Sequence, residues 1–353
     1  MNDIICDKLK RLQPYDPGLD DSRIHLDANE SCMELTDAMK QKIGEKMQQI
    51  HYNRYPDPLA AEVCSLFGGR YNIPPRFITA GNGSDELITL LLSGFVQSGE
   101  KVLLTEPDFS MYRIYCESAE CTPVIVGKNN ALSFDPDELI ERANAEQVRL
   151  VLFSNPCNPT GQGISRADVL KIVEQVNCLV VVDEAYMDFW DQSVLDIAPS
   201  AENLIILKTC SKIGFAAARL GFAIANSALT DYLRAAKSPY NVNALTQAAG
   251  SIFLGEKDYL TGAIDAIKRS RDRLYKALKE LEQNYPNGMR VYETHTNFVL
   301  VRFKNSKQVA ETIKAFGISV RCIAGCLRIT AGTEQENREL ISVLGKILTV
   351  ECS

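Results

Sequence analysis

The fold is decided at residues 179–186, which read LVVVDEAY. Four apolar residues, three of them β-branched, are followed directly by Asp183, Glu184, Ala185 and Tyr186. An apolar run without polar alternation is typical of a strand that is buried on both faces of a sheet. Because ligands bind outside the carboxyl ends of parallel strands, the polar residues after this run are candidates for a site.

The same pattern recurs on both sides of this segment. Apolar runs rich in β-branched residues predict further strands at Lys101–Glu106, Thr122–Val126, Arg149–Ser154, Leu204–Thr209 and Leu220–Ala225. Stretches with helical spacing lie between several of them, at Asp85–Val96, Met111–Ala119 and Ala167–Val176. Strands that alternate with helices predict an α/β fold with a mostly parallel sheet between helices.

The C-terminal part of the chain has a different pattern. Asp258–Gln283 predicts one long, charge-rich helix. After a turn, short strands and helices alternate at Asn297–Phe303, Lys307–Phe316, Ile318–Arg321, Leu327–Thr330 and Glu334–Leu348. We therefore expect a large domain over residues 41–255 and a smaller α+β domain over residues 256–353. Residues 1–40 are expected to pack on the small domain or at a dimer interface.

The composition of the 353-residue chain restricts its class. With 46% apolar and 24% charged residues, a folded globular protein is expected rather than a disordered one. The net charge of -7 argues against nucleic acid as the main partner. The sequence has no apolar run of about 18 residues, so no membrane-spanning helix is expected.

Eleven cysteines are scattered along the chain, and residues 1–11 contain no apolar run that would predict a signal peptide. Free cysteines without a secretion signal favour a reducing compartment, so we expect a cytoplasmic protein. The pairs Cys116/Cys121 and Cys322/Cys326 do not have the spacing of a zinc site, and no metal is expected.

Polar clusters follow four apolar segments: Gly81–Glu86 comes after Ile78–Ala80, and Lys208–Lys212 comes after Leu204–Leu207. The other two clusters, Asn155–Gly161 and Asp183–Tyr186, come directly after the apolar runs that end at Ser154 and Val182. Each cluster has an ordinary alternative. Ser84 is a good N-cap for a helix after a glycine turn, Asn-Pro-Thr-Gly is a common turn sequence, Asp183 could cap a helix, and Lys212 could be a surface lysine. Their convergence on one edge of the sheet predicts a single site instead.

Catalysis by pyridoxal 5′-phosphate (PLP) needs such a set of residues. A lysine must form a Schiff base with the cofactor aldehyde, a carboxylate must keep the ring nitrogen protonated, and a cradle must hold the phosphate. Lys212 and Asp183 can supply the first two groups. The glycine turn at residues 81–83 before a helix, and Arg219 seven residues after Lys212, can supply the cradle.

With these residues the sequence resembles the fold-type I PLP-dependent aminotransferases of class I/II, and among them the histidinol-phosphate aminotransferase family. The resemblance covers nearly the whole chain. Its matching segments are Leu26–Glu30, Asn53–Pro56, Gly81–Glu86, Asn158–Gly161, Val181–Tyr186, Thr209–Lys212, Arg219–Gly221, Asn297–Val299 and Leu327–Thr333.

The resemblance implies a role for each residue around the cofactor ring. Lys212 would form the Schiff base and move the proton during the reaction, and Asp183 would pair with the ring nitrogen. Asn158 and Tyr186 would hydrogen-bond the ring hydroxyl, and Phe109 would stack on the ring.

The resemblance also implies contacts at the two ends of the site. The cofactor phosphate would be held by Ser84, Asp85, Ser211 and Arg219. Tyr55 would reach this phosphate from the partner subunit, which implies a homodimer with shared active sites. Arg328 would bind the anionic group of the substrate, with Arg321 as a candidate second contact.

Three departures from the family pattern bear on this interpretation. Met33 stands where the family has a tyrosine for the substrate phosphate. Lys212 and Arg219 are seven residues apart, where the family usually has one more. Arg321 and Arg328 are also separated by fewer residues than usual in the family.

The chain is therefore expected to be a homodimeric, cytoplasmic, PLP-dependent aminotransferase. Its best substrate candidate is L-histidinol phosphate, with glutamate/2-oxoglutarate as the amino-group partner. Alternatives on the same scaffold are a threonine-phosphate decarboxylase and an aromatic or broad-specificity aminotransferase. A non-catalytic ligand-sensing module would often lack Lys212 or Asp183, and a nucleotide-binding doubly wound enzyme needs a glycine fingerprint that is not found.

Overall fold

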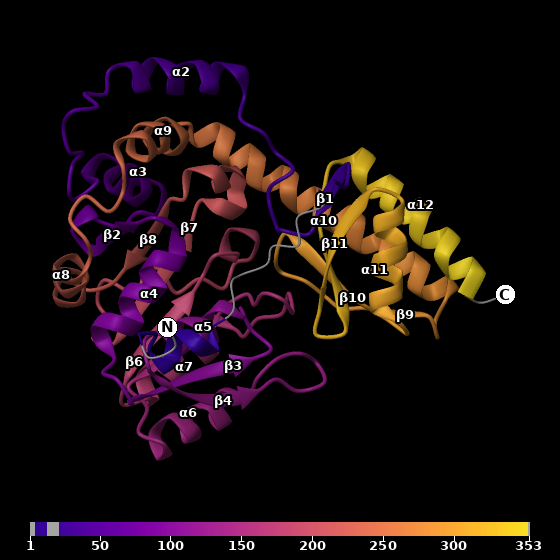
Figure 1. Ribbon diagram of the computed structural model, residues 1–353, viewed down its shortest axis with the longest axis horizontal. Helices are drawn as coiled ribbons and strands as arrows, with labels where there is room; N and C mark the ends of the chain where they lie inside the picture. The colour runs from indigo at the N-terminus through magenta and orange to yellow at the C-terminus, as the bar shows by residue number, and fades with distance from the viewer. Residues whose placement is uncertain (1–3, 13–20, 352–353) are drawn as a thin grey trace.

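The computed structural model describes residues 4–12 and 21–351 of the chain. Two β-sheets, each covered by helices, are joined by one long helix, α10 (Lys257–Asn284; Figure 1). The larger sheet has seven strands in the order β2-β8-β7-β6-β5-β3-β4. Their bounds are β2 (Ile78–Gly81), β3 (Lys101–Glu106), β4 (Thr122–Gly127), β5 (Leu150–Ser154), β6 (Leu179–Asp183), β7 (Leu204–Thr209) and β8 (Gly221–Ile224).

The predicted strands of this sheet are confirmed to within one residue at each end. Strands β3 to β7 all run parallel to one another, and β8 is antiparallel to both β7 and β2. The expected mostly parallel sheet is therefore present. The helices around it are α2 (Asp37–Gln48), α3 (Ala61–Tyr71), α4 (Gly83–Phe95), α5 (Met111–Ser118), α6 (Pro136–Ala145), α7 (Arg166–Gln175), α8 (Ser227–Ala236) and α9 (Ala244–Gly255), with a short α1 (Asp7–Arg11) near the start.

Alternate residues of the central strands face two separate apolar cores. Val180 and Val182 of β6 belong to the core that includes residues of α3, α6, α7 and α9. Val181 belongs to the core on the opposite face, under α4, α5 and α8. Because both faces are covered, each strand is apolar along its length, which explains the absence of polar alternation in the sequence.

The smaller sheet has five strands in the order β1-β11-β12-β10-β9. Its strands are β1 (Ile24–Leu26), β9 (Met289–Val291), β10 (Phe298–Phe303), β11 (Ile318–Ile323) and β12 (Cys326–Thr330). Helices α11 (Ser306–Ala315) and α12 (Glu334–Glu351) pack against it and complete a separate apolar core. β1 is parallel to β11, with Ile24 opposite Ile318, so a segment from the beginning of the chain joins the C-terminal sheet.

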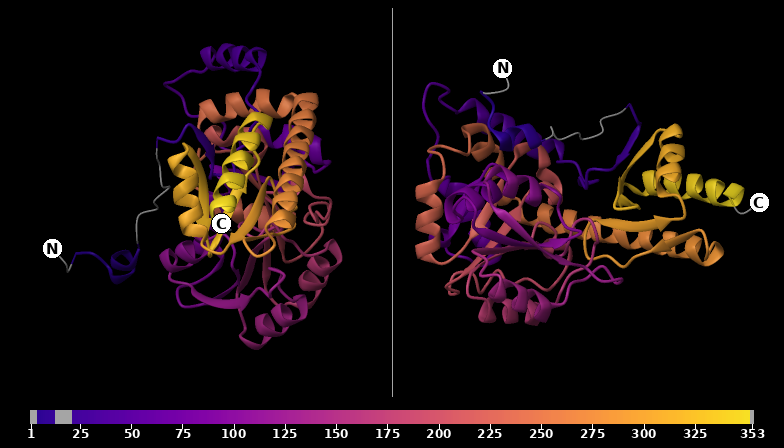
Figure 2. Two further views of the ribbon diagram at one scale, coloured as in Figure 1. Left: turned by 90° about the vertical axis from the view of Figure 1, so that its right-hand side faces the viewer. Right: turned by 60° about the horizontal axis from the view of Figure 1, so that its bottom comes forward.

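Helix α10 contributes to the cores of both sheets. Leu260 and Ile267 pack in the core of the large sheet, and Leu274 and Leu278 in that of the small sheet. Figure 2 shows the helix passing from one group of elements to the other. We keep the boundaries at residues 40 and 255 as a proposal; residues 1–3 and 13–20 of the N-terminal segment lie outside the described part of the chain.

Membrane-spanning helices and clusters of metal-ligating side chains can be assessed over residues 4–12 and 21–351. No helix among them is both long and apolar enough to cross a membrane. No group of three or more His, Cys, Asp or Glu side chains among them is arranged to hold a metal ion.

Candidate active site

One cavity of about 950 Å³ brings together nearly all of the predicted site residues. It lies at the carboxyl ends of the parallel strands and is bounded on one side by the small sheet. The predicted residues that line it are Ser84, Asp85, Phe109, Asn158, Asp183, Tyr186, Ser211, Lys212, Arg219, Arg321 and Arg328.

Tyr55 is the predicted site residue that this chain does not bring to the cavity. Its side chain is 80% exposed and stacks on Tyr240, with ring centroids 4.5 Å apart. Met33, which replaces the tyrosine of the family, is half-buried against the core of the large sheet and is not among the residues that line the cavity.

The N-terminus of α4 forms one end of the cavity. Gly83, the first residue of this helix, has a φ of +81°, and the backbone amides of a first helical turn have no partners within the helix. The prediction that Ser84 is the N-cap is wrong: Asn82 occupies that position without a side-chain cap. The helix thus begins two residues earlier than a Ser84 N-cap would place it, and the carboxylate of Glu86 accepts a hydrogen bond from the Asn82 amide.

Two glycines allow three backbone segments to meet at this helix end. A Cβ atom on Gly83 would lie 2.7 Å from Nη2 of Arg219. A Cβ atom on Gly221 would lie 2.7 Å from the carbonyl carbon of Gly83 and 2.8 Å from the amide nitrogen of Ser84. Only glycine therefore permits this close approach of the strand, the helix and the arginine.

The loop between Lys212 and Arg219 is compact rather than open. A kinked turn over Ser211–Phe215, in which Gly214 has a φ of +109°, is followed by a 3-10 turn over Ala216–Ala218. Arg219 then adopts a left-handed conformation, with Nη1 3.2 Å from Oγ of Ser211 and Nη2 3.1 Å from Oδ2 of Asp85. The short spacing thus still delivers Arg219 to the N-terminus of α4.

Asp183 ends β6 and is almost completely buried. Its Oδ2 accepts a hydrogen bond of 2.8 Å from the Tyr112 hydroxyl, and its Oδ1 accepts one of 3.0 Å from the Ala185 amide. Burial raises the pKa of Asp183 to about 6; the two hydrogen bonds oppose this rise, and the charges of Asp108 and Asp85 add to it. Asp183 is thus a buried carboxyl group held by neutral donors, and a cationic ligand beside it would stabilise its ionised form.

Tyr112 was not among the predicted site residues. It lies one helical turn after Phe109, and the two rings contact each other edge to face at 5.4 Å. The (i, i+3) spacing places the two rings on the same side of the turn and is the signal that could have identified Tyr112.

Asn29 is a second site residue that the sequence analysis did not single out, although it lies in a matching segment. Its side-chain amide donates a hydrogen bond of 2.8 Å to the hydroxyl of Tyr186. Its backbone is tied to the small sheet, because its amide donates to Oγ1 of Thr330 and its carbonyl accepts from Asn297. Lys212 lies nearby, with Nζ 5.8 Å from the centroid of the Tyr186 ring.

Arg321 and Arg328 lie opposite each other on β11 and β12. The turn between these strands consists of Ala324 and Gly325, both with positive φ, as in a two-residue type I′ hairpin. The short spacing noted in the sequence therefore reflects a minimal turn. Arg328 is buried; its Nη1 donates to Oδ1 of Asn158 at 2.6 Å, and its Nη2 donates to the carbonyl oxygen of Asp27.

Comparison with known proteins identifies the family. Residues 21–344 match the model of aminotransferase class I and II. Histidinol-phosphate aminotransferase of Clostridium novyi is 40% identical over 348 residues, which cover 95% of each chain. The enzyme of the same name from Caldanaerobacter subterraneus is 34% identical over 99% of this chain and 100% of its own.

Solved structures share the fold at lower identity. Histidinol-phosphate aminotransferase from Sinorhizobium meliloti, in complex with PLP, has a TM-score of 0.87 at 21% identity over 98% of both chains. L-threonine-O-3-phosphate decarboxylase from Porphyromonas gingivalis has a TM-score of 0.79 at 21% identity and covers 92% of this chain and 99% of its own. These matches confirm the predicted fold class and, at the level of the family, the prediction of a PLP-dependent aminotransferase. The chain belongs to the aminotransferase class I and II family.

Proposed function

We propose that this protein is a PLP-dependent aminotransferase for a phosphorylated amino substrate, L-histidinol phosphate, with glutamate/2-oxoglutarate as the amino-group partner. It acts as a homodimer in the cytoplasm. The observation that carries the proposal is the presence in one cavity of a lysine, a buried carboxylate and a helix N-terminus with an adjacent arginine.

The residues around the cavity fit PLP. The glycine cradle formed by Gly83 and Gly221 leaves the amides of α4 accessible to an anion, and Arg219 and Ser211 stand beside them. Asp183, held by neutral donors, has the charge to meet a protonated ring nitrogen. When bound, PLP supplies an aldehyde and a ring that accepts electrons from the substrate.

The side chains around the ring would orient the cofactor. Asn29 donates to the Tyr186 hydroxyl, which leaves the hydroxyl proton of Tyr186 to donate to the ring oxygen. Likewise, the carbonyl oxygen of the Asn158 side chain accepts from Arg328, which leaves the amide group of Asn158 as a donor. Phe109 would stack on one ring face. Lys212 would bind the aldehyde carbon and, once released by the substrate, move the proton as a base.

Arg328 and Arg321 would bind the anionic group of the substrate. Both line the cavity on adjacent strands, and two guanidinium groups can bind the oxygens of a phosphate or carboxylate. The names of the relatives that are 34–40% identical support histidinol phosphate as the substrate. Because Met33 stands in place of the tyrosine that contacts the substrate phosphate in the family, we assign the binding of this phosphate to the two arginines.

The homodimer is supported by an exposed aromatic and apolar surface around Tyr55. The exposed residues near it in sequence or by ring contact are Tyr52, Leu59 and Tyr240. A tyrosine that is 80% exposed in one chain is placed to be buried by a second. A cytoplasmic location is supported by the free thiols of the described cysteines, which suit a reducing compartment.

The test is an absorbance spectrum of the purified protein with PLP, followed by separate additions of L-histidinol phosphate and L-glutamate. We expect a near-visible band that borohydride fixes on Lys212 and that both compounds bleach. If glutamate alone bleaches the band, the substrate assignment falls and another aminotransferase specificity replaces it.

The same protein is then incubated with L-threonine phosphate. Release of carbon dioxide would replace the proposed transamination with decarboxylation, the activity named for the P. gingivalis structure. A protein that forms no near-visible band with PLP would contradict the proposed function as a whole.

A further inference from the structure

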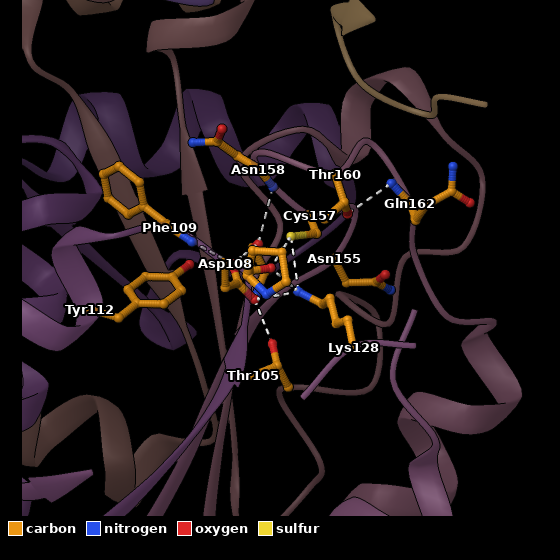
Figure 3. A network of polar contacts seen from close by, with 12 residues as sticks. Thr105, Asp108, Phe109, Tyr112, Lys128, Asn155, Cys157, Asn158, Thr160 and Gln162 are labelled. Carbon is orange, nitrogen blue, oxygen red and sulfur yellow. Dashed lines mark hydrogen bonds and ion pairs between the residues drawn. The ribbon is translucent and has the colours of Figure 1, made fainter. Parts of the chain in front are cut away.

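A buried lysine that the proposed function does not use lies beneath the cavity. The side chain of Lys128, which follows β4, is only 2% exposed. Its Nζ lies 3.2 Å from Oδ2 of Asp108, 2.7 Å from the carbonyl oxygen of Pro107 and 3.0 Å from Sγ of Cys157. Figure 3 shows the ammonium group pointing into this cluster, with Phe109 and Asn158 on its far side.

Asp108 connects this lysine to two residues of the cofactor site. Its Oδ1 accepts a hydrogen bond of 2.8 Å from the backbone amide of Phe109 and a short one from the Ser154 hydroxyl. Oγ of Ser154 in turn accepts from the amide of Asn158 at 3.4 Å. The Asp108 carboxylate thus holds the loops that carry the proposed ring-stacking and ring-hydroxyl contacts.

The same contacts bring a second negative charge close to Asp183. Ser154 and Asp183 are paired neighbours at the ends of β5 and β6, and Asp108 contacts Ser154 through both its amide and its hydroxyl. The negative charge of Asp108 is one cause of the raised pKa of Asp183. A nearby cation is needed to offset this effect.

Lys128 has the properties of that cation. Burial lowers the pKa of Lys128, but the Asp108 carboxylate and the Cys157 thiol outweigh burial, so its pKa lies above the usual value. The lysine therefore remains charged at neutral pH. Asp85, the other carboxylate near Asp183, is paired with Arg219.

We propose that Lys128 is a charge-balancing and positioning residue of the cofactor site: it neutralises Asp108, so that Asp183 provides the negative charge for the cofactor ring, and it fixes the carboxylate that orients Phe109 and Asn158. This inference rests on the proposed function. The titratable groups that face Lys128 and Asp108 are Cys157, Tyr112 and Asp183.

The test uses the opposite charges of Lys128 and Asp108. Lys128→Met leaves an extra negative charge near the cofactor, which stabilises the protonated form of the bound cofactor. Asp108→Asn leaves an extra positive charge, which destabilises that protonated form. In the PLP-loaded protein we expect the pH midpoint of the near-visible band to rise in Lys128→Met and to fall in Asp108→Asn, each by about half a pH unit or more. The double variant should return close to the unsubstituted protein.

A second buried lysine provides the matched control. Lys208 lies 2.8 Å from Asp188, and both side chains are about as buried as the Lys128–Asp108 pair. Lys208 lies in β7 on the same face as Leu204 and Ile206, which pack in one core. Asp183 lies on the opposite face, the side of Val181, which packs in the other core. Lys208→Met should lower the melting temperature of the PLP-free protein much as Lys128→Met does, without moving the pH midpoint.

The outcomes separate the two proposals. Shifts of the same sign in both single variants, or shifts no larger than in Lys208→Met, would show that the network is only structural. If Lys128→Met does not fold, the downward shift in Asp108→Asn and its reversal in the double variant decide the question. Failure of the unsubstituted protein to form the band with PLP would instead contradict the proposed function.

Discussion

At Asp183, burial opposes the charge that the proposed chemistry needs. Its carboxyl group has a pKa raised to about 6, and Tyr112 and Ala185 donate the hydrogen bonds that keep it from rising further. The ionised form is therefore lost as the pH falls through about 6. PLP binding that depends on the ionised carboxylate should weaken over the same range.

Tyr112→Phe tests this balance. Loss of the hydroxyl removes a hydrogen bond that lowers the pKa of Asp183, so the acid limb of PLP affinity should move to higher pH by roughly half to one unit. PLP titrations between pH 5 and 8 measure this limb. Tyr115→Phe is the control, because Tyr115 donates to Asp85 rather than to Asp183; an equal shift in both variants would contradict the assignment.

Lys212→Ala tests the nucleophile. We expect no borohydride-fixed cofactor and a loss of transamination of about 10⁴-fold or more, because both the covalent bond and the base are removed. Mass spectrometry after reduction and steady-state rates measure the two effects. Lys237→Ala, at a lysine outside the cavity that contacts Pro58 and Asn241, should retain both; fixation of PLP elsewhere in Lys212→Ala would identify a different lysine.

At the scale of elements, the proposed phosphate end of the site depends on how α4, β8 and the 211–219 loop meet. The helix begins at a glycine with positive φ, and β8 begins at a glycine pressed against that helix end. The loop ends in Arg219, which closes the same corner. The glycines therefore set the distance at which a phosphate can approach the helix amides.

Gly83→Ala should weaken PLP binding by about tenfold or more, because the new methyl group displaces Arg219 and the positive φ disfavours alanine. Equilibrium titration of the PLP-free protein measures this affinity. Gly94→Ala in the same helix is the matched control, since its Cβ atom would make an ordinary 3.5 Å contact with Ala236. Equal affinities of the two variants would show that the glycine corner does not bind the phosphate.

At the scale of the whole molecule, the site is built from both sheets. Arg328 of the small sheet donates to Asn158 of the large one, and Asn29 links Tyr186 to Thr330. Helix α10 is anchored in both cores, so the relative placement of the sheets rests on one continuous element as well as on these polar contacts. Tyr55 alone among the predicted residues remains outside this arrangement.

Mixing two weakened variants tests whether Tyr55 acts across a dimer. In a mixed dimer of Lys212→Ala with Tyr55→Ala, one site has both residues intact, so random exchange should restore about a quarter of the sites. Activity after subunit exchange measures this recovery. Lys212→Ala mixed with Asp183→Asn is the control, because no intact site can form; absence of recovery in the first mixture would show that Tyr55 does not complete the partner's site.

The sequence alone predicted the strands of the large sheet and the two residues that are central to the proposed site. Val180, Val181 and Val182 predict a strand covered on both faces, and Asp183 directly after them lies at the strand end where a ligand is expected, because an unbroken apolar run and the residue that ends it are both visible in a short stretch of sequence. Lys212 is found in the same way after another strand.

Only the tertiary structure showed which side chains form hydrogen bonds or ion pairs with the residues of the proposed site. Tyr112 reaches Asp183 across 71 residues of chain and Asn29 reaches Tyr186 across 157, while Lys128 meets Asp108 beneath the cavity. Such contacts depend on the order of the strands in the sheet and on how the loops close, and hydrophobic periodicity, which describes neighbouring residues, does not specify either. The same reason explains why the sequence did not show how Arg219 reaches α4 despite the short spacing, since the kinked turn over 211–215 and the 3-10 turn after it are visible only in the structure.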